Sequence, residues 1–110
     1  MTASKIINCT PHVLNINGHK FPPSGIVPRV SMKRETLGNL IGYNDIPCYT
    51  NLCGGLEDMP KSETNTIHIV SSLVRTHKDN ITRRDVASPG NLLRDDDGNV
   101  VGCNGLDFNY

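Results

Sequence analysis

Arginine side chains are the residues of this 110-residue chain with the clearest chemical potential. A guanidinium group presents forked N–H donors that match the spacing of phosphate oxygens. Taken singly, each arginine is more simply interpreted as a surface residue that pairs with Asp79 or Asp85. Taken as a set, they fit a site for a small phosphate-bearing anion equally well. The candidate phosphate ligands are Arg29, Arg75, Arg83, Arg84 and Arg94.

Two serines precede one of these arginines. Ser71 and Ser72 follow an apolar run and stand just before Arg75. A serine at this point is typical of a helix N-cap, and the free N–H groups of a first helical turn could face an anion. Capping alone is the simpler interpretation, because most helices need a cap and few bind anions. We keep both serines as candidate ligand contacts.

Two polar turns could supply further contacts. Thr10 and His12 flank a proline, which restricts the backbone and makes an unusually stiff turn. Ser24 lies in a second rigid turn, Pro-Pro-Ser-Gly. Irregular polar segments at sheet edges are common places for ligand contacts. Thr10, His12 and Ser24 therefore join the candidate site.

Cysteine and histidine suggest two other kinds of site, which their spacing does not favour. Cys9-x2-His12 and Cys48-x4-Cys53 do not match the paired C-x2-C spacing of zinc sites. Cys9 and His12 also lack an evident third group that would orient them for nucleophilic catalysis. The start of the chain shows no secretory signal, so we expect reduced and mostly buried cysteines.

Other catalytic signatures are missing from the sequence. The acidic run from Asp95 to Gly98 does not fit a calcium loop, because Leu93 and Asn104 would occupy ligand positions that need carboxylates. A hairpin turn explains the run better. The chain has no glycine-rich phosphate loop, no nucleophile elbow and no dinucleotide fingerprint. We predict a non-enzymatic protein with no cofactor and no metal.

Composition limits the classes of partner. The net charge is zero, which argues against DNA or RNA duplexes, since these require a basic surface. Segment 75–85 nevertheless carries four Lys or Arg against two Asp, enough for a small anion. No apolar run is long enough to span a membrane, so we expect a cytosolic protein. Two Phe, three Tyr and no Trp predict a small core, which favours a homo-oligomer.

Strand and turn signals set the expected fold. A strand should begin at Thr66 or Ile67 and lead into a helix of about residues 72–77, with Leu73 and either Val74 or His77 on its inner face. Hairpins are expected at Asn17-Gly18, at Asn44-Asp45 and around 95–98, with a further turn at 87–90. The sum predicts one domain over residues 1–110. It is a β-rich α+β fold of short antiparallel strands, a small barrel or sandwich, with one short helix.

Five phrases of the sequence, in this order, carry a family resemblance: NCTPHVLNI, FPPSGIVPRV, IHIVSSLV, RRDVASPG and LRDDDGNVVGC. From Ile6 to Cys103 the chain resembles a family of small proteins carried by phages and prophages. Cys9 stands where the family has leucine, and Pro28 precedes Arg29. Neither change affects the polar positions.

The resemblance implies a function by analogy of size and origin. Small phage proteins of this kind are similar to anti-defence sponges, which sequester nucleotide signals of the Thoeris system (cyclic ADP-ribose isomers) or of CBASS (cyclic oligonucleotides). It implies a homo-oligomer in the cytoplasm of an infected bacterium, which holds its ligand without cutting it. The arginines would hold phosphates, Ser71 and Ser72 would assist, and Thr10, His12 and Ser24 would contact ribose or base.

Two other functions stay open. The first is a protein–protein interaction module that inhibits a host defence protein directly or serves as a virion accessory protein. The proline-bearing edge strands and the aromatic C-terminal tail favour it. The second, a small hydrolase using His12 with Cys9 or Asp85, is the weakest of the three.

Overall fold

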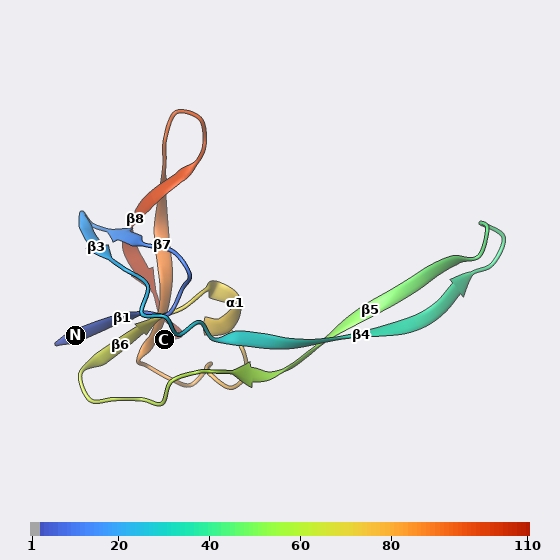
Figure 1. Cartoon of the computed structure of the whole chain (residues 1–110), viewed down its shortest axis with the longest axis horizontal. Helices are drawn as coiled ribbons and strands as arrows, with labels where there is room; N and C mark the ends of the chain where they lie inside the picture. The colour runs from blue at the N-terminus through green and yellow to red at the C-terminus, as the bar shows by residue number, and fades with distance from the viewer. Residues whose placement is uncertain (1–2) are drawn as a thin grey trace.

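The computed structural model describes residues 3–110, and residues 1 and 2 of the predicted domain lie outside that range. Within it the chain forms eight strands and one short helix (Figure 1). In order these are β1 (Lys5–Asn8), β2 (Leu14–Ile16), β3 (His19–Phe21), β4 (Arg29–Leu40), β5 (Ile46–Glu57), β6 (Thr66–Ile69), α1 (Ser72–Arg75), β7 (Val86–Arg94) and β8 (Val100–Asp107). The predicted β-rich α+β class with one short helix is confirmed.

Six strands form a nearly closed, barrel-like sheet in the order β1-β6-β7-β8-β2-β3, and β4 and β5 form a separate two-stranded sheet. The strand directions differ from the antiparallel arrangement that the sequence predicted. Pairs β1–β6, β6–β7 and β2–β8 are parallel, whereas β2–β3, β4–β5 and β7–β8 are antiparallel. Each parallel pair joins strands that are distant in sequence or separated by α1, connections that hairpin signals do not reveal.

A buried asparagine links the two ends of the barrel-like sheet. The side chain of Asn8 is 3% exposed, and its Nδ2 donates to the backbone oxygens of His12 at 2.7 Å and Phe21 at 2.9 Å. Its Oδ1 accepts from the backbone N–H of Thr10 and from its hydroxyl, at 3.0 and 2.7 Å. One side chain thus joins the end of β1 to the end of β3.

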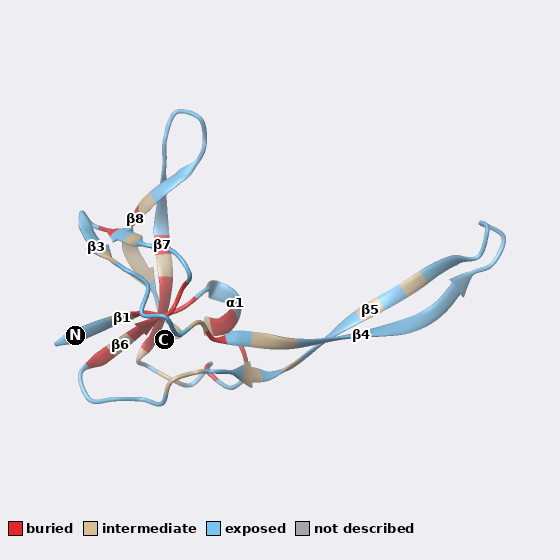
Figure 2. Ribbon diagram, in the orientation of Figure 1, coloured by how far each residue is buried: buried red, intermediate tan, exposed pale blue. Residues whose placement is uncertain are grey.

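The core lies on both faces of the central strand β6 (Figure 2). One cluster gathers under α1 and the root of β4 and β5: Cys9, Val70, Val74 and Val86, with Ile7, Val30, Leu56 and Met59 against it. The other fills the space between β6, β2 and β8: Ile16, Ile69 and Cys103, with Leu14, Phe21, Ile67 and Leu106. Alternation along a strand explains how one short element serves both clusters.

The helix is shorter than predicted. Ser71 is the N-cap, with its Oγ accepting from Val74 N–H at 3.3 Å, as its position indicated. The helix ends at Arg75 with Thr76 as its C-cap, and the next N–H, that of His77, bonds to the backbone oxygen of Val74 only three residues back, which tightens the last turn. Leu73, expected on the inner face, is 60% exposed, while Val74 is buried.

The strands β4 and β5 form a long hairpin, here called the arm, which extends away from the body (Figure 1). The predicted hairpin at Asn44-Asp45 is present, but each of its strands is 12 residues long, and Ile41 to Tyr43 lie in the turn. The radius of gyration is 17.9 Å, against about 13 Å for a compact chain of this length. The arm accounts for the elongation.

The hairpins at Asn17-Gly18 and around 95–98 form as predicted, but the turn expected at 87–90 does not. Strand β7 runs straight through these residues. Only Val86 and Ala87 of β7 have partners on β6, so Pro89 needs no N–H on that side. The carboxylate of Asp107 on β8 lies close to Gly90, and a Cβ there would be 2.6 Å from its Oδ1, so a larger residue would displace that side chain.

Candidate functional site

A polar pocket of about 250 Å³ lies between the loop after α1 and the C-terminal tail. It is lined by Ile81, Thr82, Arg83, Arg84, Asn109 and Tyr110. The guanidinium of Arg84 lies over the ring of Tyr110, with Cζ 5.1 Å from the ring centroid. The ring of Phe108 packs against Tyr110 at a centroid distance of 5.6 Å. An exposed cation therefore stands beside an aromatic face, within reach of a hydroxyl and an amide.

Arg75 fastens the tail that forms one wall of this pocket. Its Nη1 donates to the Asn109 side-chain oxygen at 2.8 Å and to the backbone oxygen of Phe108 at 3.3 Å, and its Nε donates to Ser88 Oγ at 2.7 Å. The Asn109 amide in turn donates to the backbone oxygens of Arg75 and Asn80. The guanidinium of Arg75 is thus engaged within the fold and positions the pocket.

Arg83 fastens the opposite wall. It donates to both carboxylate oxygens of Asp85, at 3.0 and 2.7 Å, and to the backbone oxygen of Pro60 at 2.8 Å. Burial acts to raise the pKa of Asp85, but the hydrogen bonds and charge of Arg83 outweigh it and hold that pKa below its usual value. The fully buried His68 donates from Nδ1 to the same carboxylate at 3.3 Å. Arg83 therefore orders the loop that carries Arg84.

The other two candidate arginines lie apart from this pocket. Arg94 donates to the backbone oxygen of Gly98 at 2.9 Å and so stabilises the β7–β8 turn. Arg29 is exposed at the start of the arm, opposite Glu57 in the strand register. Of the five arginines, the structure brings together Arg75, Arg83 and Arg84.

The predicted serine and threonine contacts also have local roles. Ser71 caps α1, and Ser72 is exposed in its first turn. Thr10 is 8% exposed, and its hydroxyl is engaged by Asn8. Ser24 accepts from the N–H of Ile26 at 3.3 Å within its own turn. None of these four residues lines the Arg84 pocket.

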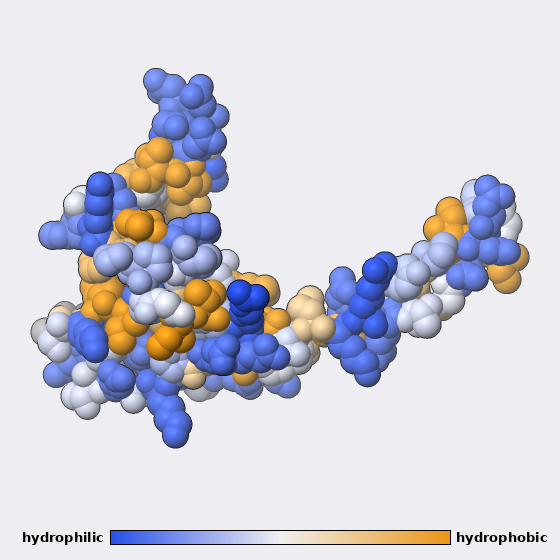
Figure 3. All heavy atoms as spheres, in the orientation of Figure 1, coloured by the Kyte–Doolittle hydropathy of each residue, from blue (hydrophilic) through white to orange (hydrophobic). Residues whose placement is uncertain are grey.

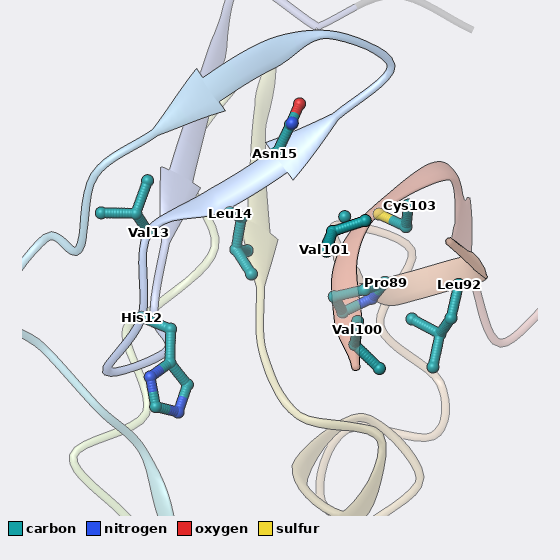
Figure 4. Close-up of a pocket in the computed structure, with 10 residues that line it drawn as sticks. His12, Val13, Leu14, Asn15, Pro89, Leu92, Val100, Val101 and Cys103 are labelled. Atoms are coloured by element: carbon teal, nitrogen blue, oxygen red, sulfur yellow. The ribbon is translucent and has the colours of Figure 1, made fainter. Parts of the chain in front are cut away.

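His12 borders a different, apolar pocket of about 300 Å³ (Figure 4). Residues from the turn before β2, from β2 itself and from the β7–β8 hairpin surround it: His12, Val13, Leu14, Asn15, Pro89, Leu92, Val100, Val101, Gly102 and Cys103. Its lining suits an apolar side chain better than a phosphate. The structure thus separates His12 from the arginines with which the sequence grouped it.

The alternative hydrolase would use His12 with Cys9 or Asp85, and neither of these two residues is well suited to that role. Burial raises the pKa of the Cys9 thiol, with a smaller opposing effect of a hydrogen bond from Ser24, so this thiol is a poor nucleophile. Asp85 is engaged by Arg83 and His68. All four cysteines are free, and the expectation that they are mostly buried holds for Cys9 and Cys103 but not for the exposed Cys53.

Sequence reasoning missed four residues of the polar pocket: Ile81, Thr82, Asn109 and Tyr110. Tyr110 carried a signal, since an aromatic tail suggests docking on the body, and docking next to the two consecutive arginines would have located the pocket. Asn109 carried none, because its role depends on two backbone oxygens that come near it only in the folded chain.

Comparisons with known proteins bring no relative: no family model, curated protein or solved structure matches the chain. Within residues 3–110, no helix has the length and apolarity needed to cross a membrane, and no three His, Cys, Asp or Glu residues gather as a metal would require.

Proposed function

We propose that this protein binds a small nucleotide-derived anion and holds it without cleaving it. The supporting observation is the pocket in which Arg84 lies over the ring of Tyr110, between walls fastened by Arg75 and Arg83. The resemblance to small phage proteins gives the ligand class: a cyclic ADP-ribose isomer or a cyclic oligonucleotide made by a bacterial immune system. The protein would act as a phage anti-defence sponge in the bacterial cytoplasm.

The pocket offers separate contacts for the parts of a nucleotide. An aromatic ring stacks on a base, and each such contact is worth about 1–3 kcal/mol. The Arg84 guanidinium is the charged donor for a phosphate, and the Thr82 hydroxyl suits a ribose oxygen. Both walls are already ordered before a ligand binds. Binding therefore costs less conformational entropy of the protein than it would if the walls were mobile.

The lining of the pocket supports retention of the ligand without cleavage. The six residues around the pocket include no carboxylate, thiol or imidazole, the usual general bases and strong nucleophiles of proteins. Its volume of about 250 Å³ is below the 300–1,000 Å³ typical of a ligand site. A second subunit could add the missing wall, which is consistent with a homo-oligomer.

Thermal unfolding against a nucleotide panel tests this proposal. The panel contains cyclic ADP-ribose isomers, cyclic di- and trinucleotides, NAD and ADP-ribose. A ligand at a hundredfold excess over its Kd stabilises the folded state by about 2.7 kcal/mol, which raises Tm by several degrees. We expect one cyclic species to shift Tm and to be recovered chemically intact. No shift with any member refutes the proposal, and an altered ligand would indicate an enzyme.

Matched variants locate the site. We expect Arg84→Ala or Tyr110→Ala to weaken binding by about 10- to 100-fold, the loss of one charge-assisted or stacking contact. Arg94→Ala is the control, because it removes an exposed arginine whose hydrogen bond lies in the β7–β8 turn. Equal loss in the control would place the site elsewhere.

The protein–protein module remains the second candidate, and one observation favours it. The arm exposes many large apolar residues, which is unusual for a monomeric surface. Co-purification of one stoichiometric host or phage protein with the intact chain, together with no nucleotide binding, would select this function.

A further inference from the structure

The isolated chain exposes more surface than a protein of its mass should. Its solvent-accessible area is 7709 Å². A folded monomer of 12.1 kDa exposes about 6,000 Å², so the excess is about 1,700 Å². Obligate subunits bury about 1,000–2,500 Å² each on assembly. The excess is similar in size to the surface that one copy loses in a stable homo-oligomer.

Much of the excess lies on the arm, which is a two-stranded ribbon with no third strand beside it. A lone hairpin is marginally stable in water and normally needs a further element to cover its apolar side chains. Seven large apolar residues between 37 and 52 are at least 46% exposed: Leu37, Leu40, Ile41, Tyr43, Ile46, Tyr49 and Leu52.

The two faces of the arm differ in character. Cross-strand register and alternation place Leu40, Ile46 and Leu52 on one face. The other face carries Arg34 stacked at 3.8 Å over Tyr49, a contact that suits a solvated surface.

The face with Leu40, Ile46 and Leu52 also carries Lys33 and Glu35, which form an ion pair at 3.4 Å nearer the root of the arm. The apolar part of this face therefore lies at the far end of the arm, at Leu40 and Ile46. This end, together with the turn, is the part of the arm that needs a partner.

The turn at the end of the arm presents two apolar side chains in a fixed shape. Ile41 is 90% exposed and Tyr43 is 71% exposed. Gly42, Asn44 and Asp45 all have positive φ, the conformations of a tight turn set by its own residues. Figure 3 shows apolar atoms at this far end of the arm. We call the segment Leu40–Ile46 the tip.

The root of the arm is firmly attached to the body. His77 accepts from the N–H of Asp79 at Nδ1 and donates from Nε2 to the backbone oxygen of Gly54 at 2.6 Å. Val30 and Leu56, which pair across the ribbon, pack against the core cluster under α1. Because the root is fixed, the arm holds its tip at a defined distance from its own body.

The body carries an apolar pocket that matches the tip. It is the pocket of about 300 Å³ between β2 and the β7–β8 hairpin, where Figure 3 shows a second apolar area. Val13, Leu92, Val100 and Val101 are each at least 50% exposed around it. A cavity of about 150 Å³ holds benzene, so this one has room for Tyr43 and a neighbouring aliphatic side chain. His12 and Asn15 are polar groups available at the border to the Tyr43 hydroxyl.

We propose that the tip of one copy docks in the apolar pocket of the next, so that the chains assemble head to tail. Each copy then loses surface at its own tip and at its own pocket, and both losses contribute to the excess of about 1,700 Å². Contacts of this kind close into a ring or continue as a chain. The inference rests on the homo-oligomer included in the proposed function. It uses none of the residues of the Arg84 pocket, so this contact is separate from the one that would add a wall to that pocket.

Two variants that each remove one half of the contact test the proposal. Ile41→Glu places a charge on the tip, and Val101→Glu places one in the pocket. We expect the parent chain to be oligomeric by sedimentation velocity at micromolar concentration and each variant to be monomeric. Mixing the two variants should restore one good contact per pair and give a 1:1 heterodimer. Asn51→Glu is the control, since it adds the same charge to the other face of the arm and should assemble like the parent.

Several outcomes would overturn the proposal. These are a monomeric parent chain, a Val101→Glu variant that assembles like the parent, or a mixture that stays monomeric. Circular dichroism must show both variants folded, and Leu92→Glu replaces Val101→Glu if the latter unfolds. The ligand-binding variant Arg84→Ala separates the two claims. If it assembles normally while no nucleotide binds the parent, the proposed function fails and the interface stands.

Discussion

The strand β6 and the arm differ in how deeply their apolar residues are buried. In β6 and the residue after it, Ile69 and Val70 are both 0% exposed, although the segment is only four residues long. In the arm, two strands of 12 residues leave Leu40 and Ile46 about half exposed. The difference is the number of neighbours: β6 lies between β1 and β7 with core clusters on both faces, whereas each arm strand pairs only with the other. Strand length therefore gives no measure of where stability resides.

Truncation of a core residue gives the largest contrast between the two regions. Ile69→Ala should destabilise the chain by about 4 kcal/mol, because it removes a fully buried side chain and leaves a cavity. The change in unfolding free energy is measured by urea denaturation. Ile41→Ala, at 90% exposure, should change it by less than about 0.5 kcal/mol in dilute, monomeric protein. Similar values for both would mean that the arm is part of the cooperative core.

The next largest effect is expected when Asn8, which joins β1 to β3, is replaced. Asn8→Ala should cost about 3 kcal/mol, since it leaves buried groups of Thr10 and Phe21 without partners. Asn8→Asp tests the direction of the bonds, because it keeps the acceptor but loses the donor to His12 and Phe21. Asn8→Asp should be at least as unstable as Asn8→Ala at pH 7, because it places a buried carboxylate oxygen against the two carbonyl oxygens that Nδ2 now binds. Urea denaturation should therefore rank the parent above both variants. An unchanged midpoint for Asn8→Ala would show that the link is not needed.

Low pH should lower the unfolding free energy of the body, because it protonates Asp85. Its pKa is lowered in the folded state, so its contribution to stability is present above the unfolded value of about 3.9 and is lost as the pH falls through the folded value. Asp85→Asn should therefore be less stable than the parent at pH 7 and should lose less stability on acidification from pH 5 to pH 3. Denaturation midpoints across this range measure the difference. Parallel curves would contradict the assignment.

The smallest expected effect on the monomer is at the tip. Tyr43→Ala should leave the unfolding free energy of dilute protein within about 0.5 kcal/mol of the parent. In concentrated solution the same change should lower Tm, because assembly no longer stabilises the folded state by mass action. Calorimetry at two protein concentrations measures both. A concentration-independent Tm for the parent would remove the reason to expect a difference.

Local signals in the sequence were sufficient for much of the fold. The Asn17-Gly18 turn, the Ser71 cap and the start of β6 at Thr66 follow from backbone preferences of a few adjacent residues. The same local preferences gave a wrong prediction at 87–90, where no turn forms and β7 continues. Proline and glycine usually mark turns, but here Pro89 has no partner on the β6 side and Gly90 pairs with Gly105 of β8.

The candidate site shows the same division. The sequence identified arginines as the groups able to bind phosphate, because that capacity resides in the guanidinium itself. It could not separate Arg84, which is exposed beside Tyr110, from Arg75 and Arg83, which are engaged by the tail and by Asp85. That distinction depends on which acceptors lie within 3 Å in the folded chain.

The sequence by itself determined the types of element, most of the turns and the chemical character of the ligand groups, since these arise from single side chains and short backbone segments. Tertiary structure alone decided the parallel pairings and the extension of the arm. It also decided the separation of His12 from the arginines and the meeting of residues 81–84 with the C-terminal tail. The physical reason is that each of these depends on contacts between residues distant in sequence, whose free energies are set by which surfaces the whole chain can bury together.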